Sequence, residues 1–466
     1  MRRKLIILVV MILMAMVVMS INLWTVNPPE SLNDLHVDCS VVIGRIRSLQ
    51  GMNCGPLEIM RPRQISENER IYNFSMQYLE LGVDYVRTHD FYGPGDIDVI
   101  FPDFDADPTL PSNYNFTKTD FLIQGIKAIG TDIIFRLGYS WSTPHANVSH
   151  IDASDYERWA EICKHIIMHY NDGWANGFHY NIAYWEIWNE PDFNVFWTGT
   201  SQEYFGLYEV TARTLKAYNS DLKVGGPGLA NNLTFAADLL NFCRNRNVPL
   251  DFFSWHMYTP TDPNPYNICV RAERVQELLG EYGFSSAESL LTEWNIAGGG
   301  AHEEYWNTKG AAYTSSELIY MQDTNIAIAN RYRGDAHGMG LFNTEGIAQK
   351  PFYAFKAFKF LLETPNRLNC TGSNELGYAV MASKSDGDKV VTILISDFNS
   401  NYKGYKLEVS NLPWKNKPFK YERYLLDDSH NLELVDSRDC AEANQFLITE
   451  NMASPSVQLI RLSVIE

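Results

Sequence analysis

Two short stretches of the sequence each place a glutamate at the end of an apolar run. The first reads WEIWNEP at residues 185–191, and the second reads LLTEWN at residues 290–295. Side chains alternate along a strand, and a proline directly after Glu190 ends the strand there, so this carboxylate is expected at the strand's C-terminal rim. Cleavage of a glycosidic bond needs two carboxyl groups, one protonated to release the alcohol and one ionised to attack the anomeric carbon. Glu190 and Glu293 are candidates for such a pair; the alternative for either is a structural ion pair or backbone hydrogen bonding.

The secondary-structure elements that must position these glutamates alternate between two kinds along the chain. Between about residues 50 and 360, short apolar runs alternate with longer amphipathic stretches, which is typical of βα units around a parallel sheet. Seven strands are expected at residues 85–87, 132–136, 182–188, 223–225, 252–255, 289–293 and 338–342, with a first strand near Met52. Eight strands predict an α/β fold, a (β/α)8 TIM barrel over residues 38–362. Glu190 and Glu293 would end its fourth and seventh strands, where such barrels place catalysis.

The rhythm changes after about residue 363. Short alternating strands are expected at residues 378–381, 390–395, 405–409, 421–426 and 457–462. The Asp-Gly pair at residues 386–387 is a strong signal for a hairpin turn between the first two of them. Residues 363–466 are therefore predicted to form a C-terminal β-sandwich domain.

Composition limits the classes of partner. The chain has 466 residues, more than a single core usually organises, which agrees with two domains. It carries 38 Lys and Arg against 56 Asp and Glu, a formal charge of -18, so its average surface repels a polyanion and no nucleic-acid partner is expected. Because no cluster with metal-ligand spacing occurs, the sequence predicts neither a metal nor a cofactor.

The N-terminus has the features of a targeting segment. Residues 1–4 are basic after the first methionine, and residues 5–24 are almost entirely apolar. Residues 1–24 are therefore predicted to be a signal peptide, or an uncleaved anchor that tethers the protein to a membrane. In both cases the protein is expected to be secreted or membrane-anchored, with the catalytic domain outside the cytoplasm.

Both glutamate motifs resemble those of clan A retaining glycosidases, most closely glycoside hydrolase family 39, which contains β-xylosidases and α-L-iduronidases. Further similarities are RTH at residues 87–89, GGP at residues 225–227, WHMY at residues 255–258 and NTEG at residues 343–346. The resemblance implies an enzyme, a retaining O-glycosidase that cleaves β-glycosidic bonds by double displacement. It implies that Glu190 is the acid/base and Glu293 the nucleophile.

The same resemblance implies roles for six residues that bind substrate. Asn189 would hydrogen-bond the sugar 2-hydroxyl, and Tyr258 would donate to Glu293 and keep it ionised. Arg87 would lie beneath the carboxylates and pair with Glu186 or Glu293. The remaining three would contact the sugar through ring nitrogens or by stacking, and are His89, His256 and Trp294. For each, a packed side chain without a role in binding is the alternative.

The expected substrate is an oligosaccharide or a polysaccharide. Met257 and Tyr258 follow His256 where an enzyme for uronic acids should offer a cation, which favours a neutral sugar, although Lys309 or Lys350 could reach the cavity. The leading hypothesis is an exo-acting β-xylosidase on polysaccharide-derived oligosaccharides. The alternatives are an endo-acting or other-sugar hydrolase of the same family, such as an exopolysaccharide hydrolase or an α-L-iduronidase-like enzyme, and a non-catalytic carbohydrate-binding protein.

Overall fold

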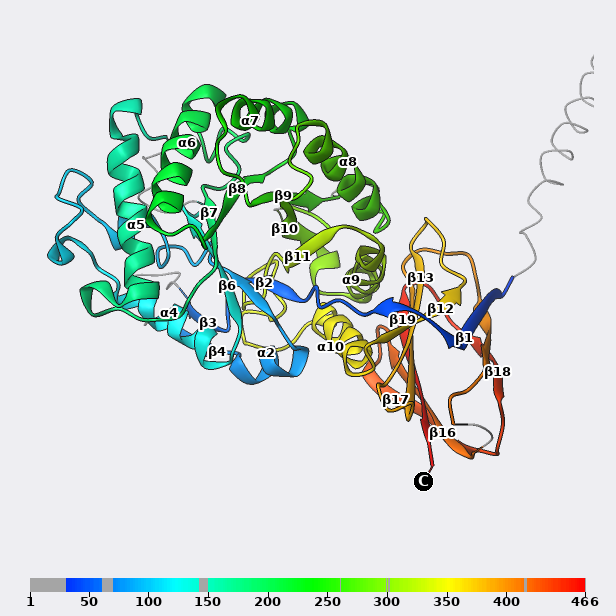
Figure 1. Ribbon diagram of the computed structural model, residues 1–466. Helices are drawn as coiled ribbons and strands as arrows, with labels where there is room; N and C mark the ends of the chain where they lie inside the picture. Colours follow the sequence, from blue (N-terminus) through cyan, green and yellow to red (C-terminus); the bar gives the residue numbers. More distant parts are fainter. Residues whose placement is uncertain are drawn as a thin grey trace, which may run out of the picture.

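The computed structural model describes residues 31–60, 70–141, 150–259, 261–298, 300, 302–414 and 417–465. These residues form a barrel surrounded by helices and a second domain made of one large sheet (Figure 1). The predicted targeting segment, residues 1–24, lies outside the described residues. Within the described part of the chain, no helix has the length and apolar character needed to cross a membrane.

Eight parallel strands close into the barrel in the order β10-β11-β2-β5-β6-β7-β8-β9. In chain order they are β2 (Gly51–Asn53), β5 (Tyr85–Arg87), β6 (Asp132–Leu137), β7 (Tyr184–Ile187), β8 (Lys223–Leu229), β9 (Phe252–Tyr258), β10 (Glu288–Asn295) and β11 (Ile326–Arg331). The predicted (β/α)8 fold is confirmed.

The eighth strand does not lie where the sequence pattern placed it. Residues 338–342 form a loop, and β11 closes the barrel instead by pairing with β10 and β2. Gly340 donates its backbone N–H to the carbonyl of His337 at 2.8 Å, which makes a tight turn in this glycine-rich segment. The apolar residues at 338–342 are buried as loop residues, so burial alone did not distinguish them from a strand.

Helices surround the barrel and cover its outer face (Figure 1). They are α2 (Ser75–Leu81), α3 (Ile97–Ile100), α4 (Thr117–Ala128), α5 (Tyr156–Asp172), α6 (Ser201–Tyr218), α7 (Leu233–Arg246), α8 (Asn267–Glu281), α9 (Thr308–Tyr320) and α10 (Lys350–Glu363). In α5, Trp159, Ile162 and Ile166 recur at helical spacing and are fully buried. A short hairpin of β3 (Leu57–Met60) and β4 (Arg70–Asn73) follows the first barrel strand.

The barrel interior is layered because side chains two residues apart on a strand share a face. An apolar layer contains Ile134, Tyr184, Phe252, Leu290 and Ile328, which form a small core of their own. Two residues further along the strands the layer is polar and fully buried, with Arg136, Glu186, Ser254, Thr292 and Asn330. The strands thus lead from an apolar base to a polar layer directly below the catalytic end.

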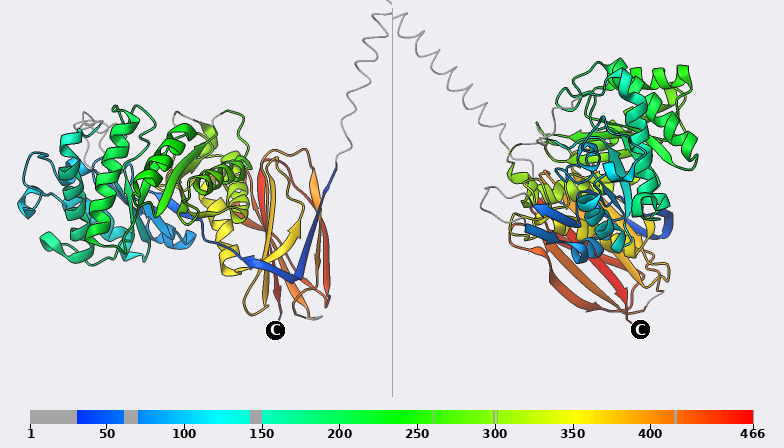
Figure 2. Two further views of the ribbon diagram at one scale, coloured as in Figure 1. Left: turned by 45° about the horizontal axis from the view of Figure 1, so that its top comes forward. Right: turned by 90° about the vertical axis from the view of Figure 1, so that its left-hand side faces the viewer.

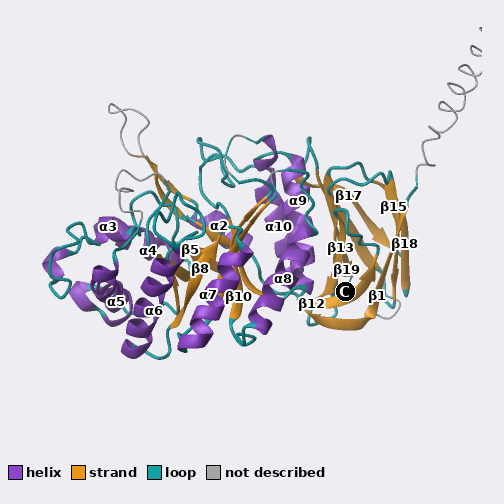
Figure 3. Cartoon of the chain, turned by 90° about the horizontal axis from the view of Figure 1, so that it is seen from above, coloured by secondary structure: helices purple, strands orange, loops and turns teal. Residues whose placement is uncertain are grey.

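The second domain is one sheet of nine strands in the order β17-β16-β19-β14-β13-β12-β1-β15-β18. Their bounds are β1 (Asn33–Arg45), β12 (Asn366–Thr371), β13 (Tyr378–Lys384), β14 (Val390–Asp397), β15 (Gly404–Ser410), β16 (Phe419–Leu426), β17 (Asn431–Cys440), β18 (Gln445–Asn451) and β19 (Ser456–Val464). The sheet curls so that β15 and β18 face β13 and β19 across a separate apolar core (Figure 3). The predicted β-sandwich is confirmed in this form.

The strand β1 belongs to the sheet domain, so the barrel begins later in the chain than the predicted boundary at residue 38. It pairs with β12 on one side and β15 on the other, so residues 38–45 belong to the sheet rather than to the barrel. The chain crosses from the sheet to the barrel after Arg45 and returns after α10. No local pattern reports such pairing, because the partners of β1 lie more than 300 residues away in the sequence.

Helices α9 and α10 lie between the barrel and the sheet (Figures 2 and 3). Ser316 on α9 donates to the carbonyl of Gly377 at 3.0 Å, and Thr308 donates to Asp428 at 2.6 Å. Apolar residues of the sheet, among them Met381 and Leu394, join the barrel core through these helices. The sheet therefore packs against the barrel through α9 and α10.

Candidate active site

A cavity of about 960 Å³ lies at the C-terminal ends of the barrel strands. Trp141, Phe193 and Phe196 form an aromatic wall of the cavity. The N-terminal half of α8 forms a second wall, which is not aromatic. Six of the eight predicted site residues line this cavity: His89, Asn189, Glu190, His256, Tyr258 and Glu293. The barrel thus brings together residues that are up to 204 positions apart, counting from His89 to Glu293.

Glu190 projects into the cavity from a sharp turn directly after β7. Its φ of 46° lies in the left-handed region, and its backbone N–H donates to the carbonyl of Gly228 at 3.0 Å. Gly228 itself has a φ of 63°, and a side chain there would approach Arg87 and His256 at 3.2 and 3.4 Å. A glycine is therefore required beside the turn that carries the carboxylate.

Glu293 reaches the cavity because β10 is irregular. The pairing of β10 with β9 shifts register between Leu291 and Glu293, so Glu293 faces inward. One carboxylate oxygen accepts from Arg87 Nη1 at 2.8 Å, and the other accepts from the hydroxyl of Tyr258 at 2.5 Å. Two donors, one of them a permanent cation, thus hold this carboxylate in place.

The two glutamates approach each other closely. One carboxylate oxygen of Glu190 lies within 4.8 Å of one of Glu293. In retaining glycosidases the two carboxyl groups are about 5–5.5 Å apart, whereas inverting enzymes need about 6.5–9.5 Å to admit a water molecule. The 4.8 Å limit applies to the nearest oxygens, and such a close approach agrees with the shorter separation of the retaining class.

The surroundings of Glu190 favour its protonated form. Burial, and then the nearby charge of Asp192, raise the pKa of Glu190 to about 8, although Arg87 opposes the shift. One oxygen shares a hydrogen bond of 2.7 Å with His256 Nδ1. Burial lowers the pKa of His256 to about 4, so the imidazole is neutral near neutral pH. Glu190 can therefore hold a proton and release it.

Glu293 is stabilised as an anion by comparison. Burial raises its pKa, but Arg87 and the Tyr258 hydroxyl act against that shift. Burial and the charge of Glu293 hold the pKa of Tyr258 well above its usual value, so its hydroxyl remains a donor. The contrast with Glu190 lies in the direct contacts: Glu293 touches a guanidinium and a phenol, whereas Glu190 touches a neutral histidine.

Arg87 is fully buried beneath the carboxylates and does not line the cavity, and its direct contact with substrate remains a prediction. It donates to Glu186 at 2.7 Å, to Glu293 at 2.8 Å and to the Asn189 side-chain oxygen at 2.7 Å. Burial would lower the pKa of the guanidinium, but Glu186 and Glu293 together hold that pKa above its usual value. The expected ion pairing is present with both glutamates, and Arg87 acts by fixing the positions of the others.

Three lining residues retain polar atoms without a partner among the described residues. These atoms are Asn189 Nδ2, His89 Nδ1 and His256 Nε2, all of them buried. Because Arg87 holds the oxygen of Asn189, the amide nitrogen is the group left to donate. A buried polar atom without a partner is unfavourable, and a sugar hydroxyl in the cavity could supply the missing bond.

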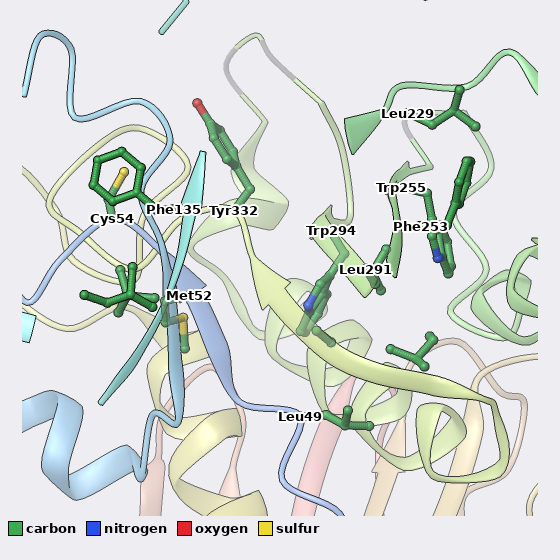
Figure 4. Packing of buried hydrophobic residues seen from close by; sticks show 14 of the residues in the cluster. Leu49, Met52, Cys54, Phe135, Leu229, Phe253, Trp255, Leu291, Trp294 and Tyr332 are labelled. Carbon is green, nitrogen blue, oxygen red and sulfur yellow. The ribbon is translucent and has the colours of Figure 1, made fainter. Parts of the chain in front are cut away.

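Trp294, which was predicted to bind the sugar, does not line the cavity. Its side chain is fully buried and packs against Phe355 of α10, with the ring centroids 5.9 Å apart. Alternation is the reason: Glu293 points into the barrel, so its neighbour points out toward the helices, into the cluster drawn in Figure 4. Trp141, which is 40% exposed, is the tryptophan that lines the cavity.

Several lining residues were not predicted. Asp90 accepts from the Tyr332 hydroxyl at 2.5 Å and from the backbone of Trp141 at 2.6 Å. Its place directly after the RTH motif could have indicated it, whereas Tyr332 follows β11, the strand that was misplaced. Arg271 and Arg274 line the cavity from α8, and nothing in the local sequence distinguishes them from surface arginines.

One group of described side chains could hold a cation. Ligand atoms of Glu190, His256 and Glu293 lie within 4.8 Å of one another. However, Arg87 already places a positive charge against Glu293, and His256 Nδ1 already bonds to Glu190. These contacts suit proton sharing better than cation binding, and the absence of a metal and of a cofactor remains a prediction.

Comparison with known proteins supports the resemblance seen in the motifs. Residues 59–282, which include Glu190 but not Glu293, match Glycosyl hydrolases family 39. A β-xylosidase of Geobacillus stearothermophilus is 25% identical over 344 residues, which cover 63% of this chain and 65% of that protein. A β-xylosidase of Caldicellulosiruptor saccharolyticus is 31% identical over 315 residues, which cover 59% and 62%. The chain thus aligns with somewhat less than two thirds of the length of each of these relatives.

The crystal structure of a glucosidase from Croceicoccus marinus superposes with a TM-score of 0.79 at 26% identity, covering 94% of this chain and all of that one. The superposition extends over both domains, so the likeness is not limited to the barrel. The paired carboxylates, the strand-end motifs and these matches agree with one another. The chain is similar to glycoside hydrolase family 39, whose family model matches residues 59–282.

Proposed function

We propose that this protein is a retaining glycoside hydrolase that cleaves β-glycosidic bonds, with Glu190 as acid/base and Glu293 as nucleophile. The observation that carries the proposal is the pair of carboxyl groups within 4.8 Å of each other, one bonded to a neutral histidine and the other to an arginine and a tyrosine. This asymmetry supplies a proton donor and an anionic nucleophile in one cavity. A non-catalytic sugar-binding protein would not need it.

The geometry supports a double displacement. Glu293 attacks the anomeric carbon as the bond to the leaving oxygen breaks, and Glu190 gives its proton to that oxygen. Glu190, now ionised, takes a proton from water, whose oxygen attacks the same carbon and releases Glu293. Asn189 is placed to bond the 2-hydroxyl through Nδ2, and this contact strengthens as positive charge develops on the ring.

The sugar that we propose for the catalytic end is β-D-xylose, released in exo fashion from polysaccharide-derived oligosaccharides. Two β-xylosidases among the relatives support it, as does the neutral lining near the glutamates, which includes Met257. Neither Lys309 nor Lys350 lines the cavity, and Lys350 instead donates to the carbonyl of His430 in the sheet domain at 3.1 Å. A β-glucoside is the second candidate, because the glucosidase from Croceicoccus marinus superposes over both domains.

A panel of aryl glycosides tests turnover, sugar and exo action together. We expect the β-D-xyloside to be cleaved with a kcat/KM at least ~100-fold above that of the α-L-iduronide, because a sugar carboxylate would lack a cation beside Glu190 and Glu293. Proton NMR should show the substrate's own anomer in the first-formed sugar. Release of the opposite anomer, or no turnover of any β-glycoside, would contradict the proposal.

We also propose export from the cytoplasm, with residues 5–24 either removed or retained as a membrane tether. The basic start and the following apolar run support this location. N-terminal sequencing of the protein recovered from the medium and from membranes distinguishes the two forms. Recovery of the intact chain in the cytoplasm alone would refute export.

A further inference from the structure

The cavity has two electrically different parts. Among its described lining residues, both arginines, Arg271 and Arg274, come from α8, and no lysine is present. Arg87 lies below the catalytic end and is engaged by its carboxylate and amide partners. Positive charge available to a ligand is therefore concentrated on the α8 wall.

One face of α8 forms this wall. Asn267, Val270, Arg271 and Arg274 all line the cavity, and their spacing of three, four and seven residues places them on a single helical face. Val270 is 57% exposed, so the face is open to the cavity rather than packed against a neighbour. The two arginines lie one turn apart on it.

Arg271 has unused capacity to bind an anion. It is half-buried, and the one hydrogen bond described for it runs from Nη2 to the carbonyl of Asn231 at 3.3 Å. Burial lowers the pKa of its guanidinium, and the charge of Asp192 offsets this only in part. The carboxylate of Asp192 is itself occupied, because it accepts from the backbone of Ala230, Asn231 and Asn232 at 2.9 Å each. A guanidinium has five N–H donors, so most of those of Arg271 have no partner among the residues that the structure describes.

Arg274 is less available. It pairs with Glu277 at 2.8 Å, and about half of its side chain is exposed. Such a pair is weak, and water screens it. Arg274 therefore adds positive potential to the wall, while Arg271 is the residue placed for direct contact.

Arg271 of the α8 wall is linked to the segment of the acid/base through Asn231 and Asp192. Asp192 follows Glu190 by two residues and holds the backbone of Asn231, whose carbonyl in turn receives Arg271. The acid donates its proton to the oxygen of the leaving group, so the leaving group must lie next to Glu190. A leaving group beside Glu190 would therefore share the cavity with Arg271.

We propose that the leaving-group side of the cavity binds a sugar unit that carries a carboxylate, with Arg271 as its partner. Planar guanidinium and carboxylate groups form two parallel hydrogen bonds, which gives both affinity and orientation. The proposal rests on the proposed hydrolase activity and extends it: the substrate has a neutral sugar at the catalytic end and an acidic sugar next to it. The net charge of the chain is -18, so its average surface repels an acidic sugar. The two arginines of α8 offset this repulsion locally and allow an acidic sugar to bind.

Two substrates that differ only in charge test the proposal by kinetics: 4-carboxyphenyl and 4-carbamoylphenyl β-D-xyloside at pH 6. In Arg271→Gln we expect kcat/KM to fall at least ~10-fold for the carboxylate and less than about twofold for the amide, as for loss of a hydrogen bond to a charged group. Arg271→Lys should recover part of the loss. Arg244→Gln, on α7 and outside the cavity lining, is the matched control and should change neither value. An equal loss on both substrates, or no loss on either, would overturn the proposal.

A binding measurement keeps the test independent of turnover. D-glucuronate and D-glucuronamide are titrated into the full chain and into Arg271→Gln by calorimetry. Tighter binding of glucuronate that disappears in the variant supports the proposal, and equal binding of both sugars refutes it. D-glucose 6-sulfate is the third ligand, and an Arg271-dependent preference for it over glucuronate would refute the carboxylate as the recognised group. If no xyloside is cleaved while this charge preference persists, the proposed activity fails and the anionic subsite stands.

Discussion

The ends of β7 and β10 place the same residue type in the same cavity, but they surround it differently. At the end of β7, Glu190 bonds to a neutral histidine, and burial, followed by the charge of Asp192, raises its pKa to about 8. At the end of β10, Glu293 accepts from Arg87 and Tyr258. Both groups are buried, so burial alone cannot separate their roles.

The difference shows that direct partners, rather than residue type or depth, assign the proton. The guanidinium beneath Glu293 neutralises the charge of this buried carboxylate, which water cannot do there. Among the described residues Glu190 has no such cation in contact, so its buried carboxyl group is more stable when protonated and neutral. Four substitutions test this comparison, from the largest expected effect to the smallest.

Glu293→Gln should lower kcat/KM by a factor of at least ~10⁴, because the amide keeps the shape of the side chain but cannot attack the anomeric carbon. The measurement uses an aryl glycoside with a good leaving group, which does not need the acid. Thermal unfolding of the variant controls for misfolding. Activity within tenfold of the wild type would show that Glu293 is not the nucleophile.

Glu190→Ala should lower kcat by ~10²–10⁴-fold on substrates with poor leaving groups and much less on activated ones, because only the former need a proton. Azide should restore part of the turnover by replacing the base in the second step. The expected product is a glycosyl azide with the substrate's own anomeric configuration. An azide of the opposite configuration would mark Glu190 as the nucleophile and reverse the two roles.

Tyr258→Phe removes one of the two donors to Glu293 and should lower kcat/KM by roughly 10–100-fold, as expected for a hydrogen bond to a charged group. The pKa of Glu293 should rise further without this donor, so the acidic limb of the pH profile should move to higher pH. Tyr332→Phe is the matched control, because Tyr332 also lines the cavity but its hydroxyl donates to Asp90. If the acidic limb moved equally in both variants, the hydrogen bond from Tyr258 to Glu293 would not be the cause of the shift.

The pH profile should show the smallest effect. Because Glu190 must be protonated in the first step, kcat/KM should fall as the pH rises through about 8, the pKa of Glu190. Asp192→Asn removes a negative neighbour that raises this pKa, so the basic limb should move to lower pH by roughly one unit or less. An unchanged basic limb would show that Asp192 does not raise the pKa of Glu190. Thermal unfolding of the variant checks that the loss of the hydrogen bonds from the backbone to Asp192 does not unfold the protein.

Short-range patterns were sufficient to predict the barrel and its two glutamates. Period-two alternation reports which residues share a face of a strand, and the proline after Glu190 marks the strand end. Such signals need only a few neighbouring residues, so seven barrel strands and the hairpin at residues 386–387 were located correctly. They were insufficient at residues 338–342, where apolar residues are buried without belonging to a strand.

The sequence by itself therefore determined the fold class, the candidate glutamates and the family motifs, because these depend on local periodicity and spacing. Only the tertiary structure decided which carboxylate meets a cation, because Arg87 comes from a strand about 200 residues before Glu293. It also turned Trp294 away from the cavity through a register shift in β10, and it brought Arg271 of α8 into the wall of the cavity that holds Glu190. Each of these outcomes depends on how distant elements pack, and no local pattern records that.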